Sequence, residues 1–201
     1  MDLSPPEIPV LLEQAKEGNQ EAFESLWLSF APRLLRQATL LCGDVSRAED
    51  IVQETLVESW KSLSRYNGSC QFFTWLCAIL HNRYRNAFRR RQFLVFWGLA
   101  QAEGFDESGI VADHPGHDGS PVELVQTRER AVLIRRCVQA LPSKQQQVIY
   151  LRFFVDDSLE GIAAALHCSV GTVKSRLFHG LEKLRRMPPV QKEHEDNESV
   201  V

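Results

Sequence analysis

The sequence predicts an all-α protein with two small helical domains joined by a flexible acidic linker. Apolar residues recur at helical spacing over most of the chain, no stretch alternates as a β-strand does, and a glycine-rich acidic segment separates two helical blocks. A chain of 201 residues is long enough for two small cores. We expect domains over residues 8–92 and 122–187, a linker over 93–121 and a disordered acidic tail over 188–201.

The first domain is predicted to contain an interrupted opening helix and two later helices. A Gly-Asn pair at 18–19 interrupts the apolar pattern of the opening helix. Ser46 and Glu49 fit a capping box at the start of the second helix. After a loop over 64–71, a third helix is expected over 72–92.

The second domain is predicted to end in a helix-turn-helix. Ser143 and Gln146 fit a capping box for an earlier helix. Residues 157–186 then form two short amphipathic helices, and Ser169 is the expected N-cap of the second. Because the second helix is basic on its outer face, the pair suits the DNA major groove. A plain helical hairpin within a bundle is the alternative.

The charge of the chain is unevenly distributed. A net charge of −3 argues against nucleic acid binding, but residues 93–123 contain six acids and no Lys or Arg. Positive charge is gathered into 83–91 and 174–186. Such clustering is what a surface that follows phosphates needs, whatever the total charge.

The predicted third helix has a polar stripe suited to unstacked bases. The stripe contains a tryptophan, two amides and arginines, namely Trp75, Asn82, Asn86, Arg89 and the adjacent Arg85. Tryptophan can stack on bases, amides can bind base edges and arginines can hold phosphates. The alternative is a core tryptophan beside a solvated arginine run. Five arginines within 83–91, with no acid among them, favour nucleic acid.

The helix before it is acidic. Its polar side carries Glu49, Asp50, Gln53, Glu54 and Glu58. Because an acidic helix would repel phosphate, we expect this side to face solvent or a protein.

The cysteines predict a reducing environment. Five cysteines, an odd number in apolar helical contexts, are expected to be buried reduced thiols of a cytoplasmic protein. Cys77 and His81 lie one helical turn apart with Cys70 nearby, which leaves a metal site as a minor alternative. Without a fourth ligand at a suitable spacing, we expect no metal and no cofactor.

Several other classes are not indicated. No apolar run approaches the roughly 18–20 residues of a membrane span, and the first residues lack the basic region of a signal peptide. No catalytic constellation or phosphate-binding glycine loop is present, so we expect no enzymatic activity of the chain itself.

Taken in order, three passages resemble bacterial RNA polymerase sigma factors of the extracytoplasmic-function (ECF) group in the sigma-70 family. Residues 48–60, AEDIVQETLVESW, resemble region 2.2, which grips the clamp helices of core polymerase. Residues 72–91, FFTWLCAILHNRYRNAFRRR, resemble regions 2.3 and 2.4, which open and read the −10 promoter element. Residues 141–154, LPSKQQQVIYLRFF, with the helix pair after them, resemble regions 4.1 and 4.2, which dock on the polymerase flap and read the −35 element.

The resemblance implies a role for individual residues. Trp75 corresponds to an aromatic wedge at the upstream edge of the melted DNA, and Tyr66 to the wall of a pocket for a flipped base. The implied −10 contacts are Tyr66, Asn67, Trp75, Asn82, Arg83, Arg85, Asn86 and Arg89. The implied −35 contacts are Lys174, Ser175, Phe178 and His179, with Thr172 and Arg176 as phosphate or base-edge contacts. The implied polymerase contacts are Asp50, Gln53 and Glu54.

Two residues depart from the family pattern. Many relatives carry Arg at the position of Asn67, so the loop over residues 66–70 lacks a positive charge. His179 stands where Arg is frequent, which weakens a charge-assisted contact with phosphate or guanine. The acidic linker resembles the ECF connector that runs toward the polymerase active-site cleft, where its charge could mimic nucleic acid.

The sequence therefore predicts a non-catalytic ECF sigma factor of the bacterial cytoplasm. Its expected partners are core RNA polymerase (clamp helices and flap), promoter DNA and an anti-sigma factor, without membrane insertion. A stand-alone helix-turn-helix regulator is the main alternative, but it leaves the acidic helix and the Trp75 stripe unexplained. An anti-sigma or adaptor protein is a second alternative, and it does not explain two separate basic helices.

Overall fold

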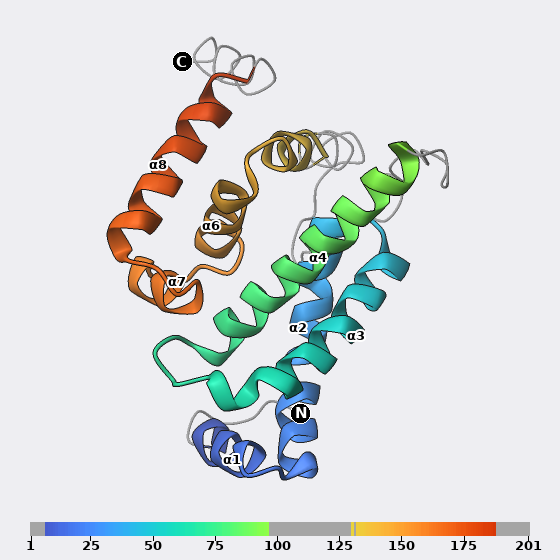
Figure 1. Ribbon diagram of the computed structural model, residues 1–201, viewed down its shortest axis with the longest axis vertical. Coiled ribbons are helices and arrows are strands. Elements are labelled where there is room, and N and C mark those ends of the chain that lie inside the picture. The colour runs from blue at the N-terminus through green and yellow to red at the C-terminus, as the bar shows by residue number, and fades with distance from the viewer. Residues whose placement is uncertain (1–6, 97–129, 131, 188–201) are drawn as a thin grey trace, which may run out of the picture. The chain divides into compact units, whose positions relative to one another are not determined.

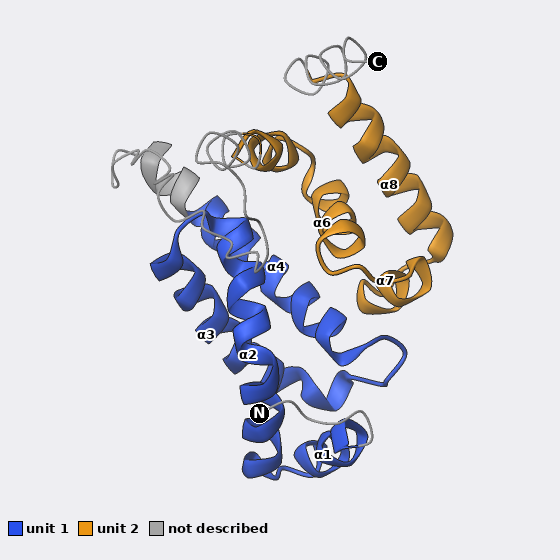
Figure 2. Ribbon diagram, turned by 180° about the vertical axis from the view of Figure 1, so that it is seen from behind, with its two compact units in different colours: residues 1–109 blue, residues 110–201 orange. Residues whose placement is uncertain are grey.

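The computed structural model describes residues 7–96, 130 and 132–187, and every regular element in these ranges is helical (Figure 1). This confirms the predicted all-α class. The chain divides into two compact units, unit 1 over residues 1–109 and unit 2 over residues 110–201 (Figure 2). The acidic tail and residues 97–121 of the predicted linker lie outside the described residues.

Unit 1 is built around helix α2 (Gln20–Cys42), against which the other long helices pack. The other elements are α1 (Glu7–Lys16), α3 (Val45–Ser62), the 3-10 turn η1 (Leu63–Arg65) and α4 (Phe72–Phe96). Helix α2 packs against α1, α3 and α4, and α3 also packs against α4. Leu26 and Leu34 of α2 and Leu76 and Leu80 of α4 are fully buried between these helices. Helix α4 continues through residues 93–96, which were predicted to belong to the linker.

Local side-chain caps explain where the helices of unit 1 begin. The side chain of Asn19 accepts a hydrogen bond from the Ala22 N–H, so the predicted interruption is the N-cap of α2. The Asp44 carboxylate accepts the Arg47 N–H at 2.7 Å and caps α3. The predicted capping box of Ser46 with Glu49 is therefore wrong, because an aspartate two residues earlier supplies the acceptor.

Unit 2 is a compact set of shorter helices. They are a helix over 132–139, α6 (Ser143–Phe153), α7 (Leu159–Ala165) and α8 (Val170–Arg185). Helix α6 packs against α7 and α8, and α7 packs against α8. The core contains Val148, Leu151, Ile162 and Val173, all fully buried.

One predicted cap in unit 2 is confirmed and one is wrong. The Ser169 hydroxyl accepts the Thr172 N–H at 3.2 Å and caps α8, as predicted. Ser143, by contrast, is the first helical residue of α6, and Pro142 at the N-cap makes no side-chain cap bond. Gln146 cannot complete a capping box, because its amide is buried and donates to the Val138 carbonyl at 3.3 Å. This bond ties α6 to the helix before it.

The cysteines are all free thiols. Cys42, Cys77 and Cys137 are buried, whereas Cys70 and Cys168 are partly exposed. Within the described ranges, no group of three or more His, Cys, Asp or Glu is arranged to hold a metal ion. No helix in the described part of the chain is both long and apolar enough to cross a membrane.

Candidate nucleic-acid interface

Helix α8 presents one face to the core and the opposite face to solvent. Val173 and Gly180 are buried. Four predicted −35 contacts, Lys174, Ser175, Phe178 and His179, are exposed together on the outer side. Phe178 is 62% exposed, and its ring meets the His179 ring edge-on at 5.5 Å. This face of α8 therefore presents an exposed aromatic ring among polar side chains.

The other two predicted −35 contacts are held at the turn before α8. The Thr172 hydroxyl lies 2.9 Å from the Ser169 hydroxyl, and an Arg176 guanidinium nitrogen lies 3.8 Å from the Cys168 sulfur. Both side chains are partly buried. The turn and the first two turns of α8 are therefore joined by side-chain contacts.

The Ser169 cap provides a test of how firmly α8 is held. Replacing Ser169 with alanine removes the acceptor for the Thr172 N–H, and we expect a loss of about 1 kcal/mol in the free energy of unfolding. Chemical denaturation would measure this loss. Ser169→Asn retains a capping oxygen and should keep most of the stability, so an equal loss in both variants would contradict the capping role.

The close approach of α8 to α6 depends on a glycine. A Cβ atom added at Gly180 would lie 2.8 Å from the Ile149 Cδ1 and 3.4 Å from the Gln145 Cβ. Ile149 is itself buried, so it has little room to move. Gly180 therefore fixes how closely the outer helix can pack on its support.

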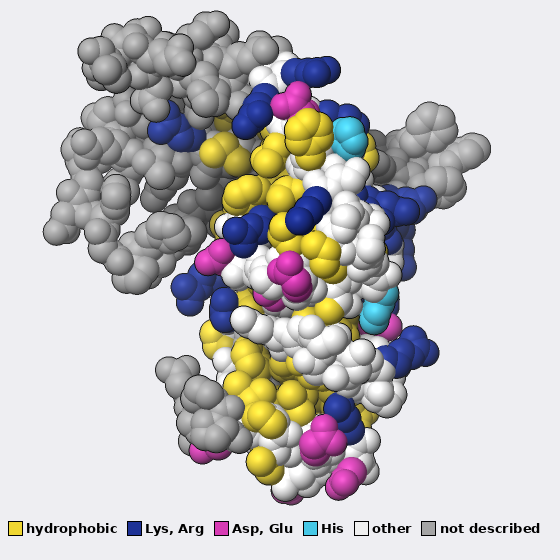
Figure 3. Space-filling view, turned by 90° about the vertical axis from the view of Figure 1, so that its left-hand side faces the viewer, with side chains coloured by type: hydrophobic (Ala, Val, Ile, Leu, Met, Phe, Trp, Pro, Cys, Tyr) yellow, Lys and Arg dark blue, Asp and Glu magenta, His cyan; other side chains and the backbone are white. Residues whose placement is uncertain are grey.

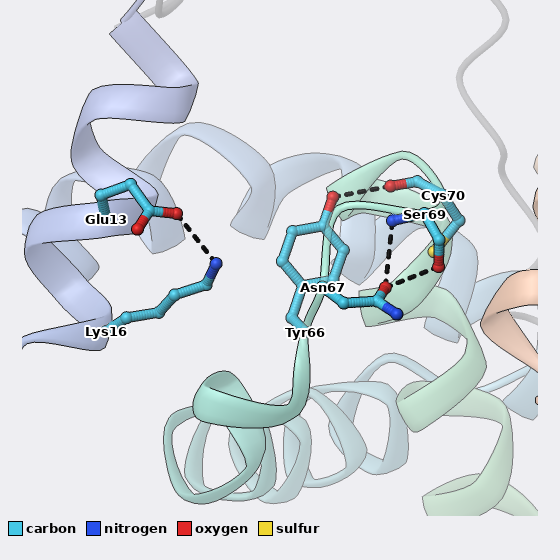
Figure 4. A network of polar contacts seen from close by, with 6 residues as sticks. All are labelled: Glu13, Lys16, Tyr66, Asn67, Ser69 and Cys70. Carbon is cyan, nitrogen blue, oxygen red and sulfur yellow. Dashed lines mark hydrogen bonds and ion pairs between the residues drawn. The ribbon is translucent and has the colours of Figure 1, made fainter.

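The loop after η1 is held by its own polar contacts (Figure 4). The Tyr66 hydroxyl donates to the Cys70 carbonyl at 2.6 Å. The Asn67 side-chain oxygen accepts bonds from the backbone N–H and the hydroxyl of Ser69, at 3.0 and 2.6 Å. Gly68 adopts a φ of +76°, a left-handed conformation that suits glycine. These contacts give the loop Tyr66–Cys70 a defined shape.

Two predicted −10 residues pack in an aromatic cluster at this loop. The Tyr66 ring lies 5.3 Å from the rings of both Phe72 and Trp75, and Phe72 stacks on Trp75 at 5.5 Å. Tyr66 and Trp75 are each only 7% exposed. A base can therefore stack on either ring only after a neighbouring side chain moves.

Burial raises the pKa of Tyr66 from its ordinary 10.0 to about 12, and the negative charge of Cys70 at high pH adds to the rise. The unfolded chain then loses this proton at lower pH than the folded chain does. We expect the stabilisation to be present below pH 10 and lost as the pH rises from 10 to 12.

Urea unfolding over this pH range, compared with Tyr66→Phe, would measure the effect. The variant should lose the hydroxyl bond, about 1 kcal/mol, at lower pH but show a shallower decline at high pH. Parallel declines of the two proteins would contradict the assignment to Tyr66.

The remaining predicted −10 residues follow α4 from this cluster. Asn82, Asn86 and Arg89 are exposed, and Arg85 is half-buried. Arg83 forms an ion pair with Glu58 of α3 at 2.6 Å. The predicted stripe is thus divided, with Trp75 in the core and the amides and arginines at the surface.

The predicted polymerase contacts share the outer side of α3. Asp50, Gln53 and Glu54 are exposed, while Ile51 and Thr55 on the inner side are buried. An exposed acidic face on a well-packed helix suits a protein partner with a basic surface.

Comparison with known proteins identifies the family. Residues 26–93 match the family model of sigma-70 region 2, and residues 131–184 match that of sigma-70 region 4. The chain is 31% identical over 180 residues to the ECF RNA polymerase sigma-E factor of Salmonella typhimurium, covering 87% of this chain and 91% of that protein. The chain belongs to the ECF sigma factors.

Other proteins similar to this chain are also sigma factors. The chain is 29% identical over 185 residues to the RNA polymerase sigma-H factor of Pseudomonas aeruginosa, covering 91% of this chain and 95% of that protein. Its structure is similar, with a TM-score of 0.55 and 26% identity, to the sigma factor RpoE of Bartonella quintana, solved in complex with the anti-sigma factor NepR. That comparison covers 81% of this chain and 94% of the other. The sigma factor therefore directs transcription initiation, with core RNA polymerase and promoter DNA as its partners.

The sequence did not reveal two contacts between helices and segments of unit 1. Lys16 of α1 lies over the Tyr66 ring, and Glu58 pairs with Arg83. Fifty positions separate Lys16 from Tyr66, and no periodicity within one helix signals a contact between two separate segments.

On the face shown in Figure 3, Lys and Arg side chains lie among exposed hydrophobic ones and form no continuous basic patch.

Proposed function

We propose that this sigma factor reads the −35 element as duplex DNA with α8 and captures the −10 element as a melted single strand with α4 and the loop Tyr66–Cys70. One observation carries the proposal. Helix α4 in unit 1 and helix α8 in unit 2 each pack one side into the core and expose amides, cations or both on the other side. In the proposed arrangement the −10 and polymerase-binding domain covers residues 8–92 and the −35-binding domain covers residues 122–187, with the acidic linker between them and no catalytic step in either.

At the −35 element, α8 enters the major groove. Lys174 binds phosphate, and Ser175 and His179 contact base edges or phosphates. Phe178 suits contact with a thymine methyl group, since its exposed ring is the apolar part of this face. Thr172 and Arg176 lie in the first two turns of α8, close to the turn between α7 and α8. There they can bind the DNA phosphates that flank the contacted bases.

At the −10 element, a base leaves the stack and enters the aromatic cluster beside the loop. Flipping costs a few kcal/mol, so a site that rewards one base makes melting itself sequence-dependent. Asn82 and Asn86 contact base edges, and Arg85 and Arg89 hold the strand by its phosphates. Tyr66 and Trp75 provide the stacking surfaces once a neighbouring side chain moves away.

The protein partners use other surfaces. We assign Asp50, Gln53 and Glu54 of α3 to the polymerase clamp helices. Phe153 and Phe154, both exposed at the end of α6, are suited to the polymerase flap. An anti-sigma factor is a further proposed partner, because the Bartonella quintana relative was solved with one.

Run-off transcription with core polymerase on a random promoter library tests the proposal. We expect transcripts above those of core alone, from promoters that share two separated motifs. Permanganate reactivity of the downstream motif, and not of the upstream one, would support single-strand capture there. No transcripts above core alone would refute the proposal. Tight sequence-specific duplex binding by the free chain would favour a stand-alone regulator.

A further inference from the structure

A lysine from the first helix lies against the proposed base-capture loop. The Lys16 ammonium of α1 is 5.8 Å from the centre of the Tyr66 ring and over its face (Figure 4). Helix α1 packs against η1, the turn that leads into the loop, so the position of Lys16 follows from the fold. The match to sigma-70 region 2 begins at residue 26, and α1 lies before it.

We propose that Lys16 is a further DNA-binding residue of the −10 site, whose ammonium leaves the Tyr66 ring and pairs with the phosphate of the captured nucleotide. This rests on the proposed function, since it adds a residue to the same site. The loop Tyr66–Cys70 itself contains no lysine or arginine. A cation supplied by α1 would therefore provide a charge that the loop does not carry.

The contacts of Tyr66 indicate which neighbour can move. Phe72 and Trp75 are buried members of the aromatic cluster, and the Tyr66 hydroxyl is bonded to the loop backbone. Lys16, in contrast, reaches the ring with a flexible side chain. Its movement would open one face of the ring while leaving the cluster and the loop in place.

The same movement places the ammonium near phosphate. A nucleotide stacked on Tyr66 carries its phosphate beside the ring, where a lysine anchored at the ring can reach it. A cation over an aromatic ring is attracted weakly, and pairing with phosphate gives a stronger, charge-assisted bond in its place. Lysine is therefore suited to cover the ring in the free protein and to bind the strand in the complex.

The carboxylate of Glu13 opposes the movement of the Lys16 ammonium from the Tyr66 ring to a phosphate. Glu13, one turn earlier on α1, pairs with the Lys16 ammonium at 2.9 Å. Its side chain is 73% exposed, so solvent screens the pair. Because Glu13 adds negative charge next to the proposed phosphate position, removing that charge should strengthen DNA binding. Substitutions of Lys16 and Glu13 should thus have opposite effects.

The test uses the full chain with core polymerase and a fluorescent single-stranded oligonucleotide of the −10 motif recovered by run-off selection. Affinity is measured over a series of salt concentrations. We expect Lys16→Gln to weaken binding roughly 3- to 10-fold and to lower the salt-dependence slope by about 0.7. Lys16→Arg should retain the slope, and Glu13→Gln should tighten binding.

Lys61→Gln is the matched control, because Lys61 is an exposed lysine of α3 in the same unit. Thermal unfolding of each variant establishes that the fold is unchanged. Unaltered binding by Lys16→Gln, or an equal loss in Lys61→Gln, would overturn the role of Lys16 while leaving single-strand capture intact. If the unaltered protein fails to prefer the single strand over duplex, the proposed function itself fails.

Discussion

Replacing Gly180 with leucine is expected to destabilise unit 2 by about 1–3 kcal/mol and to abolish recognition of the −35 element. A Cβ at this position already meets Ile149 at 2.8 Å, and a leucine side chain has to displace that buried residue or push α8 away from α6. Either response tilts the helix that carries Lys174 and Phe178. The measurements are chemical denaturation, followed by run-off transcription from a promoter with an intact −35 motif.

Gly171 provides the control in the same helix. A Cβ there would lie 3.8 Å from the Ser169 hydroxyl, which is ordinary contact. Gly171→Leu should therefore leave the free energy of unfolding nearly unchanged, or raise it through better helix propensity. Equal destabilisation by the two substitutions would show that glycine flexibility, and not the close approach at Gly180, determines the effect.

Reversing the charge of Asp50 and Glu54 together is expected to lower affinity for core polymerase at least about 10-fold. Both carboxylates are exposed on the outer side of α3, so lysines at these positions should leave the fold intact. Like charges placed opposite a basic partner surface repel it and slow association, more strongly at low salt. Affinity for fluorescently labelled core polymerase measures the effect.

Glu24→Lys on α2 is a suitable control for that experiment, because it makes the same kind of charge change at an exposed site of the same unit. It should retain affinity for core. A loss of affinity in Glu24→Lys comparable to that of the double variant would mean that the overall charge of unit 1, and not the α3 face, determines polymerase binding.

The helical fold was predictable because its signals are local. Apolar spacing predicted the helices, and the Ser169 cap lies where an N-cap residue directly precedes a periodic apolar run. The Ser46 cap was misplaced for a related reason: Asp44 and Ser46 are both good capping residues, and the pattern does not decide which one adopts the extended backbone. Residues 93–96 were assigned to the linker although α4 continues through them, because the apolar residues there fit both a helix and a linker segment.

The candidate site was less predictable, because it depends on contacts between helices. A helical wheel puts Trp75 in line with Asn82 and Asn86, but the packing of Tyr66 and Phe72 around it decides that it is buried. The contact of Lys16 with Tyr66 joins two segments whose spacing carries no periodic signal. The outer residues of α8 were easier to place, because a single amphipathic helix defines their face.

The ion pair between Glu58 and Arg83 places opposite charges together where the acidic helix α3 packs against the arginine-rich helix α4. In the proposed arrangement α4 binds DNA, and uncompensated acidic side chains of α3 next to α4 would repel the DNA phosphates. Glu58, on the side of α3 that meets α4, pairs with Arg83, whereas Asp50 and Glu54 are exposed on the outer side of α3. The opposite charges of Glu58 and Arg83 thus compensate each other where the two helices meet. In the proposed arrangement, this lets unit 1 present an acidic surface to polymerase and a separate basic surface to DNA.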